Sequence, residues 1–246
     1  MRYLGMLGAI FAFAGASFAA ATELSVSAAA SLTDAFTELA AEYEKVNPNV
    51  KIAANFGASR TLLQQIEQGA PVDVFAAADQ ATMDEGASKK LIVDESRKNF
   101  AENGIVLAEP AGKKAVTAIE DLKKDAVTHV ALGNPDYVPA GRYAKEILQA
   151  AGLWDALREK FILGENVRQV LDYIVRGEVD AGFVFSTDAR SAGDKLAVVA
   201  ELQPGTPVTY PIAVASDSPR KAEGTKFIEY VLSDAGKAIL KKYGFR

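Results

Sequence analysis

The chain has 246 residues, of which 49% are hydrophobic and 24% charged, a balance typical of globular rather than disordered proteins. It carries 27 basic and 32 acidic residues, a net charge of −5, and no cysteine. No basic run or cationic amphipathic helix is visible, which argues against nucleic acid or a membrane surface as a partner. A chain of this length can bury enough core to fold without disulfides.

The first 21 residues are typical of a secretory signal peptide, and we exclude them from the fold prediction. Arg2 supplies a positive start, Leu4–Ala16 an apolar run too short to span a membrane, and Ser17–Ala21 small residues suited to cleavage. The remaining chain has 26 basic and 32 acidic residues, a net charge of −6. Because no cysteine is present to carry a lipid anchor, we expect an exported, unanchored monomer in a bacterial periplasm.

Strand and helix patterns alternate along the rest of the chain. We predict strands over residues 23–29, 50–56, 72–77, 105–109, 127–132, 180–185 and 208–215. We predict helices over residues 33–46, 60–68, 80–88, 140–151, 156–161, 167–176, 219–232 and 235–243. This alternation favours parallel, doubly wound sheets.

The number of such units exceeds one sheet, so we predict two α/β lobes. Residues 22–106 and 211–246 would form lobe 1, and residues 107–210 would form lobe 2. The strands that cross between the lobes would then serve as a hinge.

Four predicted turns share one construction, in which a strand or loop ends where a helix begins. They place Ser31, Ser59, Ala140 and Val167 at or beside a helix start. Helix starts offer unpaired N–H donors and a partial positive charge, and ligands bind at this edge of open α/β sheets. If the four turns converge, they form an anion site without a buried Lys or Arg. The spacing does not show convergence, and each serine taken singly fits an ordinary helix cap.

The strings AAASLTDAF, FGASRTLLQQIEQGAPVDVFAAAD, GNPDYVPAGRYAKE and KKYGF resemble the periplasmic molybdate-binding proteins of ABC-type transporters. The resemblance covers residues 23–246 and implies a two-lobed periplasmic-binding-protein fold of type II with the ligand cleft between the lobes. It implies that an oxyanion, molybdate or tungstate, accepts hydrogen bonds from the hydroxyls of Ser31 and Ser59 and from the backbone N–H groups of Ala140 and Val167. It also implies a membrane permease with its ATPase as partners, and no cofactor.

Phe185 departs from the pattern of that family, which often has at this strand end a tyrosine whose hydroxyl reaches the anion. Phenylalanine has no donor, and a missing charge-assisted bond costs about 1.5–3 kcal/mol, or one to two decades of affinity. Ser186, Thr187 or Tyr137 are the candidates to replace it. Arg60 lies beside the second turn serine, where a solvent-facing role is favoured over contact with the anion.

A cage made only of donors suits a fully deprotonated oxyanion, namely molybdate, tungstate or sulfate. Phosphate near neutral pH keeps a proton that needs an acceptor inside the cleft. Asp79, Asp136 and Asp188 lie near turns, and we interpret each as a helix cap or as solvated. Sulfate therefore remains an open alternative, because the sequence does not show the size of the cavity.

Other classes of function have weaker support. The turn serines lack an activating partner, no G-x-S-x-G elbow or metal-ligand motif is present, and an enzyme is not indicated. The single histidine, His129, is predicted to be packed within a strand. A binding protein for an organic ligand or ferric ion stays as an alternative. Trp154 is interpreted as the apolar side of a helix and not as a sugar platform, and Tyr210 and Tyr230 are candidate iron ligands by residue type only.

Overall fold

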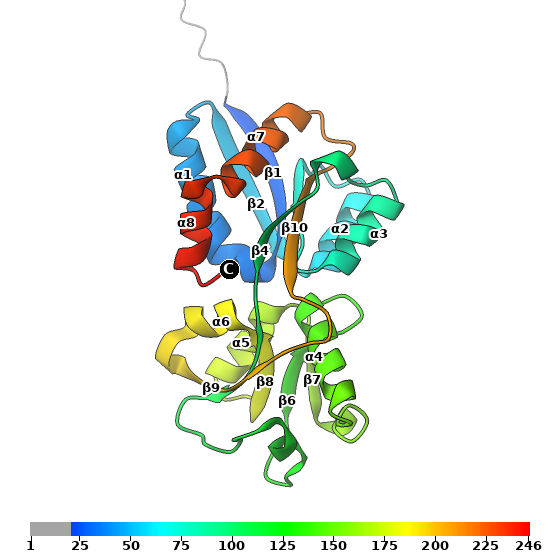
Figure 1. The fold of residues 1–246 in the computed structure, drawn as a ribbon, viewed down its shortest axis with the longest axis vertical. Coiled ribbons are helices and arrows are strands. Elements are labelled where there is room, and N and C mark those ends of the chain that lie inside the picture. Colours follow the sequence, from blue (N-terminus) through cyan, green and yellow to red (C-terminus); the bar gives the residue numbers. More distant parts are fainter. Residues whose placement is uncertain (1–20) are drawn as a thin grey trace, which may run out of the picture.

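The computed structural model describes residues 21–246, so the predicted signal peptide lies almost wholly outside the described residues. Two α/β lobes follow one another along the long axis of the molecule (Figure 1), and each contains one five-stranded sheet. The prediction of a two-lobed α/β fold is confirmed. Within residues 21–246, no helix is both long and apolar enough to cross a membrane.

The first lobe combines the N-terminal part of the chain with its C-terminal part. Its strands are β1 (Thr22–Ala29), β2 (Val50–Gly57), β3 (Val74–Ala76), β4 (Lys98–Glu102) and β10 (Thr209–Val214), in the order β2-β1-β3-β10-β4. Its helices are α1 (Thr33–Val46), α2 (Ser59–Glu67), α3 (Gln80–Ser88), α7 (Lys221–Leu232) and α8 (Asp234–Lys242). Short 3-10 turns, η1 (Ala30–Leu32) and η2 (Asp94–Ser96), precede α1 and β4.

The second lobe is formed by the middle of the chain. Its strands are β5 (Ile105–Pro110), β6 (Val130–Gly133), β7 (Phe161–Gly164), β8 (Ala181–Phe185) and β9 (Leu196–Leu202), in the order β7-β6-β8-β5-β9. Its helices are α4 (Pro139–Ala150), α5 (Val167–Val175) and α6 (Ser186–Ala192). The 3-10 turns η3 (Ile119–Lys123), η4 (Arg158–Lys160) and η5 (Gly193–Lys195) connect them.

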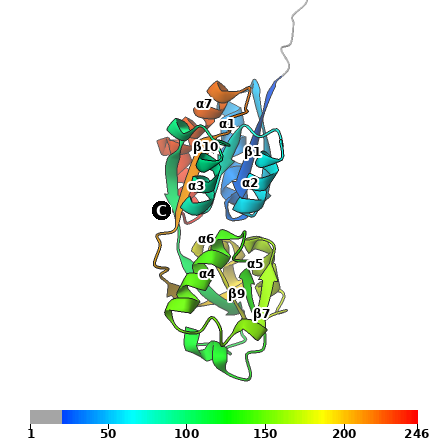
Figure 2. The ribbon, with the colours of Figure 1, turned by 90° about the vertical axis from the view of Figure 1, so that its right-hand side faces the viewer.

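Strand β3 shows why the first sheet carries helices on both faces. Val74 and Ala76 pack in the large core with side chains of α1 and α7, whereas Phe75 packs on the other face with Leu62 of α2 and Met83 of α3. Successive side chains of a strand point to opposite faces, so an apolar run such as this one must be covered twice. Figure 2 shows α2 and α3 together along this lobe.

The expectation of purely parallel sheets is wrong in part. β1 is parallel to β2 and β3, and β6 is parallel to β7 and β8. In contrast, β10 is antiparallel to β3 and β4, and β5 is antiparallel to β8 and β9. The antiparallel pairs arise because β4, β5, β9 and β10 carry the chain from one lobe into the other and back.

Two local predictions are also wrong. The helix expected over residues 156–161 is replaced by η4 and the first residue of β7. His129 is exposed and precedes β6, rather than being packed within it. Its backbone N–H donates to the carboxylate of Asp180 at 2.8 Å, so this residue is held in the turn instead of in the strand ladder.

The chain passes between the lobes at residues 103–104 and again at residues 203–208, and both crossings are visible in Figure 1. The N–H of Asn103 donates to the carbonyl of Val208 at 3.0 Å, which ties the two crossings together. Ile105 pairs with the second sheet and Tyr210 with the first, each opposite to the lobe boundary predicted from the sequence. Tyr210 therefore lies at the hinge end of the first lobe.

Candidate functional site

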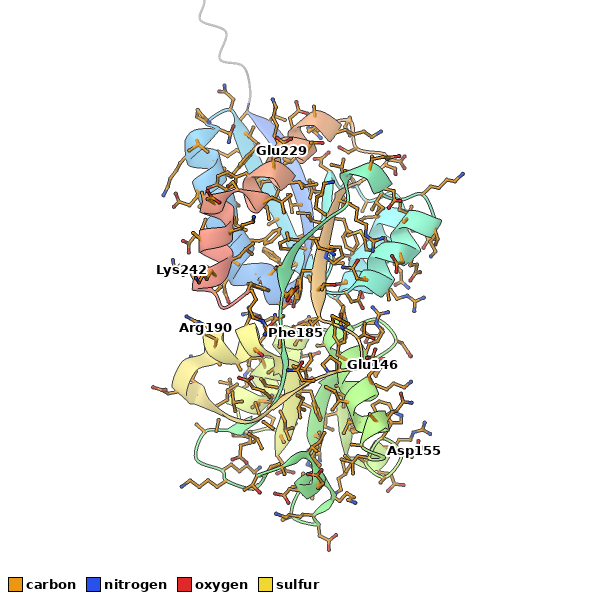
Figure 3. All side chains as sticks on the ribbon, viewed as in Figure 1. Glu146, Asp155, Phe185, Arg190, Glu229 and Lys242 are labelled. Atoms are coloured by element: carbon orange, nitrogen blue, oxygen red, sulfur yellow. The ribbon has the colours of Figure 1, made fainter. Side chains whose placement is uncertain are left out.

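A small cavity between the lobes brings together the residues that the sequence singled out. Its free volume is about 10 Å³, far below the 300–1,000 Å³ typical of pockets for drug-sized organic ligands. The thirteen residues that line it include no charged side chain; they are Ala29, Ala30, Ser31, Gly57, Ala58, Ser59, Ala78, Val138, Pro139, Ala140, Asn166, Val167 and Phe185. Figure 3 shows Phe185 at the junction of the lobes.

The two serines enter this cavity from the first lobe. Ser31 follows β1 in η1 and is 3% exposed, and Ser59 opens α2 and is fully buried. The Ser59 hydroxyl accepts the backbone N–H of Ala78 at 3.0 Å. Because a hydroxyl has one hydrogen and two lone pairs, Ser59 keeps its hydrogen free to donate into the cavity.

The second lobe contributes two helix starts. The Asn166 side chain caps α5 by accepting from the N–H groups of Arg168 and Gln169 at 2.9 and 3.1 Å, and Val167 N–H donates to no acceptor within residues 21–246. α4 begins at Pro139 without a side-chain cap, which leaves the next amide, that of Ala140, as a donor. Both ends also bring the positive end of a helix dipole to the cavity.

Gly141 explains how the start of α4 comes so close to the site. A Cβ atom at this position would lie 1.8 Å from the carbonyl oxygen of Gly133, the last residue of β6. Only glycine permits this approach of a helix to the end of a strand. The close contact holds Ala140 beside the cavity.

Phe185 is 1% exposed, with its ring centroid 5.6 Å from that of Tyr210 and 6.4 Å from that of Tyr143. Neither Ser186 nor Thr187 lines the cavity, so neither replaces a hydroxyl at position 185 there. Tyr137, the third candidate, does not line it either.

Three arginines bridge the lobes around the cavity. Arg60 donates to the backbone carbonyl of Asp136 at 2.9 Å and pairs with Glu85 at 3.0 Å within its own lobe. Arg142 of α4 pairs with Asp79 and donates to the hydroxyl of Thr82 at 2.7 Å. Arg60 is therefore neither a contact of the cavity nor simply solvent-facing, since it joins the two lobes.

Arg168 of α5 forms the third bridge, to Asp34 of α1 at 2.9 Å. It also pairs at 2.7 Å with Asp188 of its own lobe, which is fully buried and, as one of the two expected roles, caps α6 by accepting from the N–H of Phe185 at 3.3 Å. Burial raises the pKa of Asp188 to about 6, although the positive charge of Arg168 opposes the shift. Asp79 does cap its helix as expected, accepting from Thr82 N–H at 3.0 Å, while the exposed side chain of Asp136 is solvated.

Asn103 beside the site escaped the sequence analysis, and Tyr210 was considered there only as a candidate ligand by residue type. The hydroxyl of Tyr210 lies 2.9 Å from that of Ser31 and 3.1 Å from the side-chain amide of Asn103. Tyr210 and Ser31 are separated by 179 positions, and nothing local marks the tyrosine as a partner. Among residues 21–246, no group of three or more His, Cys, Asp or Glu is placed to hold a metal ion.

Comparison with known proteins places the chain in a family. Residues 24–246 match the sequence pattern of the bacterial extracellular solute-binding proteins. The molybdate-binding protein ModA of Haemophilus influenzae is 37% identical over 237 residues, 94% of this chain and 92% of that protein. The ModA protein of Escherichia coli is 36% identical over 241 residues, 96% of this chain and 93% of that protein.

A solved structure supports the fold. The periplasmic molybdate-binding protein of Azotobacter vinelandii matches with a TM-score of 0.81 over 91% of this chain and 98% of its own, at 23% identity. With the sequence matches, this shows that the chain belongs to the ModA family of bacterial extracellular solute-binding proteins.

Proposed function

We propose that this protein captures molybdate in the cavity between its lobes and delivers it to an ABC-type membrane transporter. The observation that carries the proposal is the convergence of serine hydroxyls and helix N-termini on one small cavity without charged lining. The relatives named above are molybdate-binding proteins. The family is one of solute-binding proteins and not of enzymes.

The ligand would be held through its oxygens, with no direct metal–protein bond and no cofactor. Ser31 and Ser59 would each donate through the hydroxyl, and Ala140 and Val167 through the backbone N–H. Donors aimed at a dianion form charge-assisted hydrogen bonds, which are stronger than neutral ones. Tungstate has nearly the same shape as molybdate, so we expect it to bind as well, and the hydroxyl missing at Phe185 to be tolerated.

The proposed location is the periplasm, reached through a signal peptide at residues 1–21 and without a lipid anchor. The protein would act as a monomer whose closed lobes present a joint surface to the permease. The ATPase of the transporter would supply the energy, because binding alone cannot drive transport.

The test is a titration of the mature protein with molybdate, tungstate, sulfate and phosphate, followed by thermal melting and calorimetry. Ligand at a hundred times its Kd stabilises a fold by about 2.7 kcal/mol. We expect stabilisation by molybdate and tungstate, and an increase in Kd of about 10- to 150-fold for Ser31→Ala or Ser59→Ala, equivalent to about 1.5–3 kcal/mol.

Ser88→Ala is the matched control, because Ser88 is exposed and only its own helix carbonyl at Glu85 accepts its hydroxyl. It should leave the Kd unchanged. If sulfate alone stabilised the protein, the cavity would be an oxyanion site, but its ligand would be sulfate and not molybdate. No response to any of the four anions would refute the proposal.

A further inference from the structure

The Ser31 hydroxyl ends a buried chain of hydrogen bonds that crosses the hinge. The side-chain amide nitrogen of Asn103 lies 2.8 Å from the hydroxyl of Thr187 in the second lobe and 3.1 Å from that of Tyr210 in the first. The hydroxyls of Tyr210 and Ser31 are 2.9 Å apart. All four residues are at most 4% exposed, and among them only Ser31 lines the cavity.

The backbone partners of Asn103 fix the direction of the bonds that its side-chain amide makes. The amide oxygen of Asn103 accepts from the backbone N–H groups of Gly104 at 2.9 Å and Thr187 at 3.4 Å. Its nitrogen must therefore face Thr187 and Tyr210, and a side-chain amide nitrogen only donates. The Tyr210 hydroxyl accepts this hydrogen bond and has a single hydrogen of its own. Within residues 21–246, the Ser31 oxygen, 2.9 Å away, is the one acceptor at hydrogen-bond distance for that hydrogen. Donation from Tyr210 to Ser31 is therefore the direction that leaves no buried phenol hydrogen unpaired.

This order of donors and acceptors determines the orientation of the Ser31 hydroxyl at the cavity. Its oxygen already accepts the hydrogen of Tyr210, so its own hydrogen is left free to donate into the cavity that Ser31 lines. Burial raises the pKa of Tyr210 well above its ordinary value, so the phenol keeps its hydrogen at any physiological pH. Ser59 is arranged in the same way, because it accepts the Ala78 N–H.

We infer that Tyr210, oriented by Asn103, is a positioning residue that fixes Ser31 as a hydrogen-bond donor and so favours oxyanions that carry no proton. The inference rests on the proposed function and adds to it the origin of the discrimination against protonated anions. A serine hydroxyl that is free to turn can accept a hydrogen bond from a protonated anion. One that already accepts from Tyr210 can take such a bond only on its second lone pair, which leaves its own buried hydrogen without an acceptor.

The first variant to measure is Tyr210→Phe, which keeps the ring and removes only the hydroxyl. Loss of one buried neutral bond is worth about 0.5–1.5 kcal/mol, so the Kd for molybdate should rise about 2- to 13-fold. The ratio of the phosphate Kd to the molybdate Kd should fall by at least as much, since Ser31 can now accept the phosphate proton. Tyr143→Phe is the matched control, because Tyr143 is also buried near Phe185 but does not contact Ser31.

A double-mutant cycle separates positioning from general destabilisation. In a Ser31→Ala background, Tyr210→Phe should have no further effect on the molybdate Kd, because the residue through which it acts is gone. In a Ser59→Ala background, the full effect should remain. A merely structural role would weaken binding equally in both backgrounds.

The outcomes distinguish this inference from the proposed function. A wild-type protein that binds no oxyanion refutes the proposed function itself. The role of Tyr210 is refuted, while the proposed function stands, if the wild type binds molybdate and Tyr210→Phe leaves the ratio of the phosphate Kd to the molybdate Kd unchanged. It is refuted likewise if Tyr210→Phe raises the molybdate Kd equally in the Ser31→Ala and Ser59→Ala backgrounds. If Tyr210→Phe does not fold, Asn103→Ala takes its place, because it frees the phenol to turn. Its smaller effect on the molybdate Kd must also disappear in the Ser31→Ala background. If that dependence on Ser31 is absent, the inference is refuted.

Discussion

At the scale of single residues, the site depends on where each hydrogen of a hydroxyl points. The hydroxyl oxygens of Ser59 and Ser31 each accept a hydrogen bond already, from the N–H of Ala78 and from the hydroxyl of Tyr210. The free hydrogens of both serines are then available to one ligand. The side chain of Phe185 also lines the cavity, but it has no group that could donate a hydrogen bond to the ligand.

Phe185→Tyr should strengthen molybdate binding by about tenfold or more, because it adds a charge-assisted donor at a residue that lines the cavity. Calorimetry on wild type and variant measures the effect. The melting temperature of the unliganded variant reports any strain from the added oxygen. An unchanged Kd with an unchanged melting temperature would show that the added hydroxyl does not reach the ligand.

At the scale of elements, most helices and all central strands were predictable, whereas α6 and three of the four edge strands were not. The bounds of α1 and α3 agree with the predicted ranges, and Asp79 supplies a local cap signal for α3. β4, β7 and β9 all lie at an edge of their sheet, where one side of the strand has no partner. Edge strands are less buried and more polar, which weakens the hydrophobic pattern on which sequence prediction depends.

The turn before β6 offers a test of stability at this scale. The Asp180 carboxylate accepts from the N–H groups of Thr128 and His129 at 2.6 and 2.8 Å and pairs with Lys113 at 2.5 Å. Burial alone would raise the pKa of Asp180, but these bonds outweigh it and lower the pKa below its ordinary value. A lowered pKa stabilises the fold above the pKa of the unfolded chain, near 3.9, and this stabilisation is lost as the pH falls through the folded pKa.

Asp180→Asn should therefore reduce the free energy of unfolding at pH 7 by about 2 kcal/mol, the value of hydrogen bonds to a charged group. The difference from wild type should shrink as the pH falls below about 4. Urea denaturation of both proteins at pH 7, 4 and 3 measures this difference in the free energy of unfolding. Asp125→Asn, at an exposed position of the same segment, is the control and should have little effect, and a difference that does not change with pH would contradict the argument.

At the scale of the whole molecule, affinity includes the free energy of bringing the lobes together. Arg142 and Arg168 of the second lobe reach Asp79 and Asp34 of the first, and Arg60 reaches across in the other direction. These contacts exist only when the lobes are close. A ligand that binds the closed arrangement is therefore held more weakly if closure becomes less favourable.

Arg142→Gln should raise the Kd for molybdate about 3- to 10-fold, corresponding to about 1 kcal/mol lost from the closed arrangement. Calorimetry gives the Kd, and small-angle scattering with and without molybdate shows whether the unliganded lobes are further apart than in wild type. Arg176→Gln removes the same charge from an exposed position of the same lobe and should leave both measurements unchanged. An equal effect of the two variants would mean that net charge, and not the bridge, controls affinity.

The sequence by itself determined the local units of this protein. Strand, turn and helix patterns placed Ser31, Ser59, Ala140 and Val167 at helix starts, because periodicity, caps and glycines act over a few residues. Only the tertiary structure decided that these four starts share one cavity, that some strands run antiparallel, and that Tyr210 stands behind Ser31. Such contacts join positions up to 179 residues apart, and they form only because burial of the apolar faces of both sheets brings those positions together.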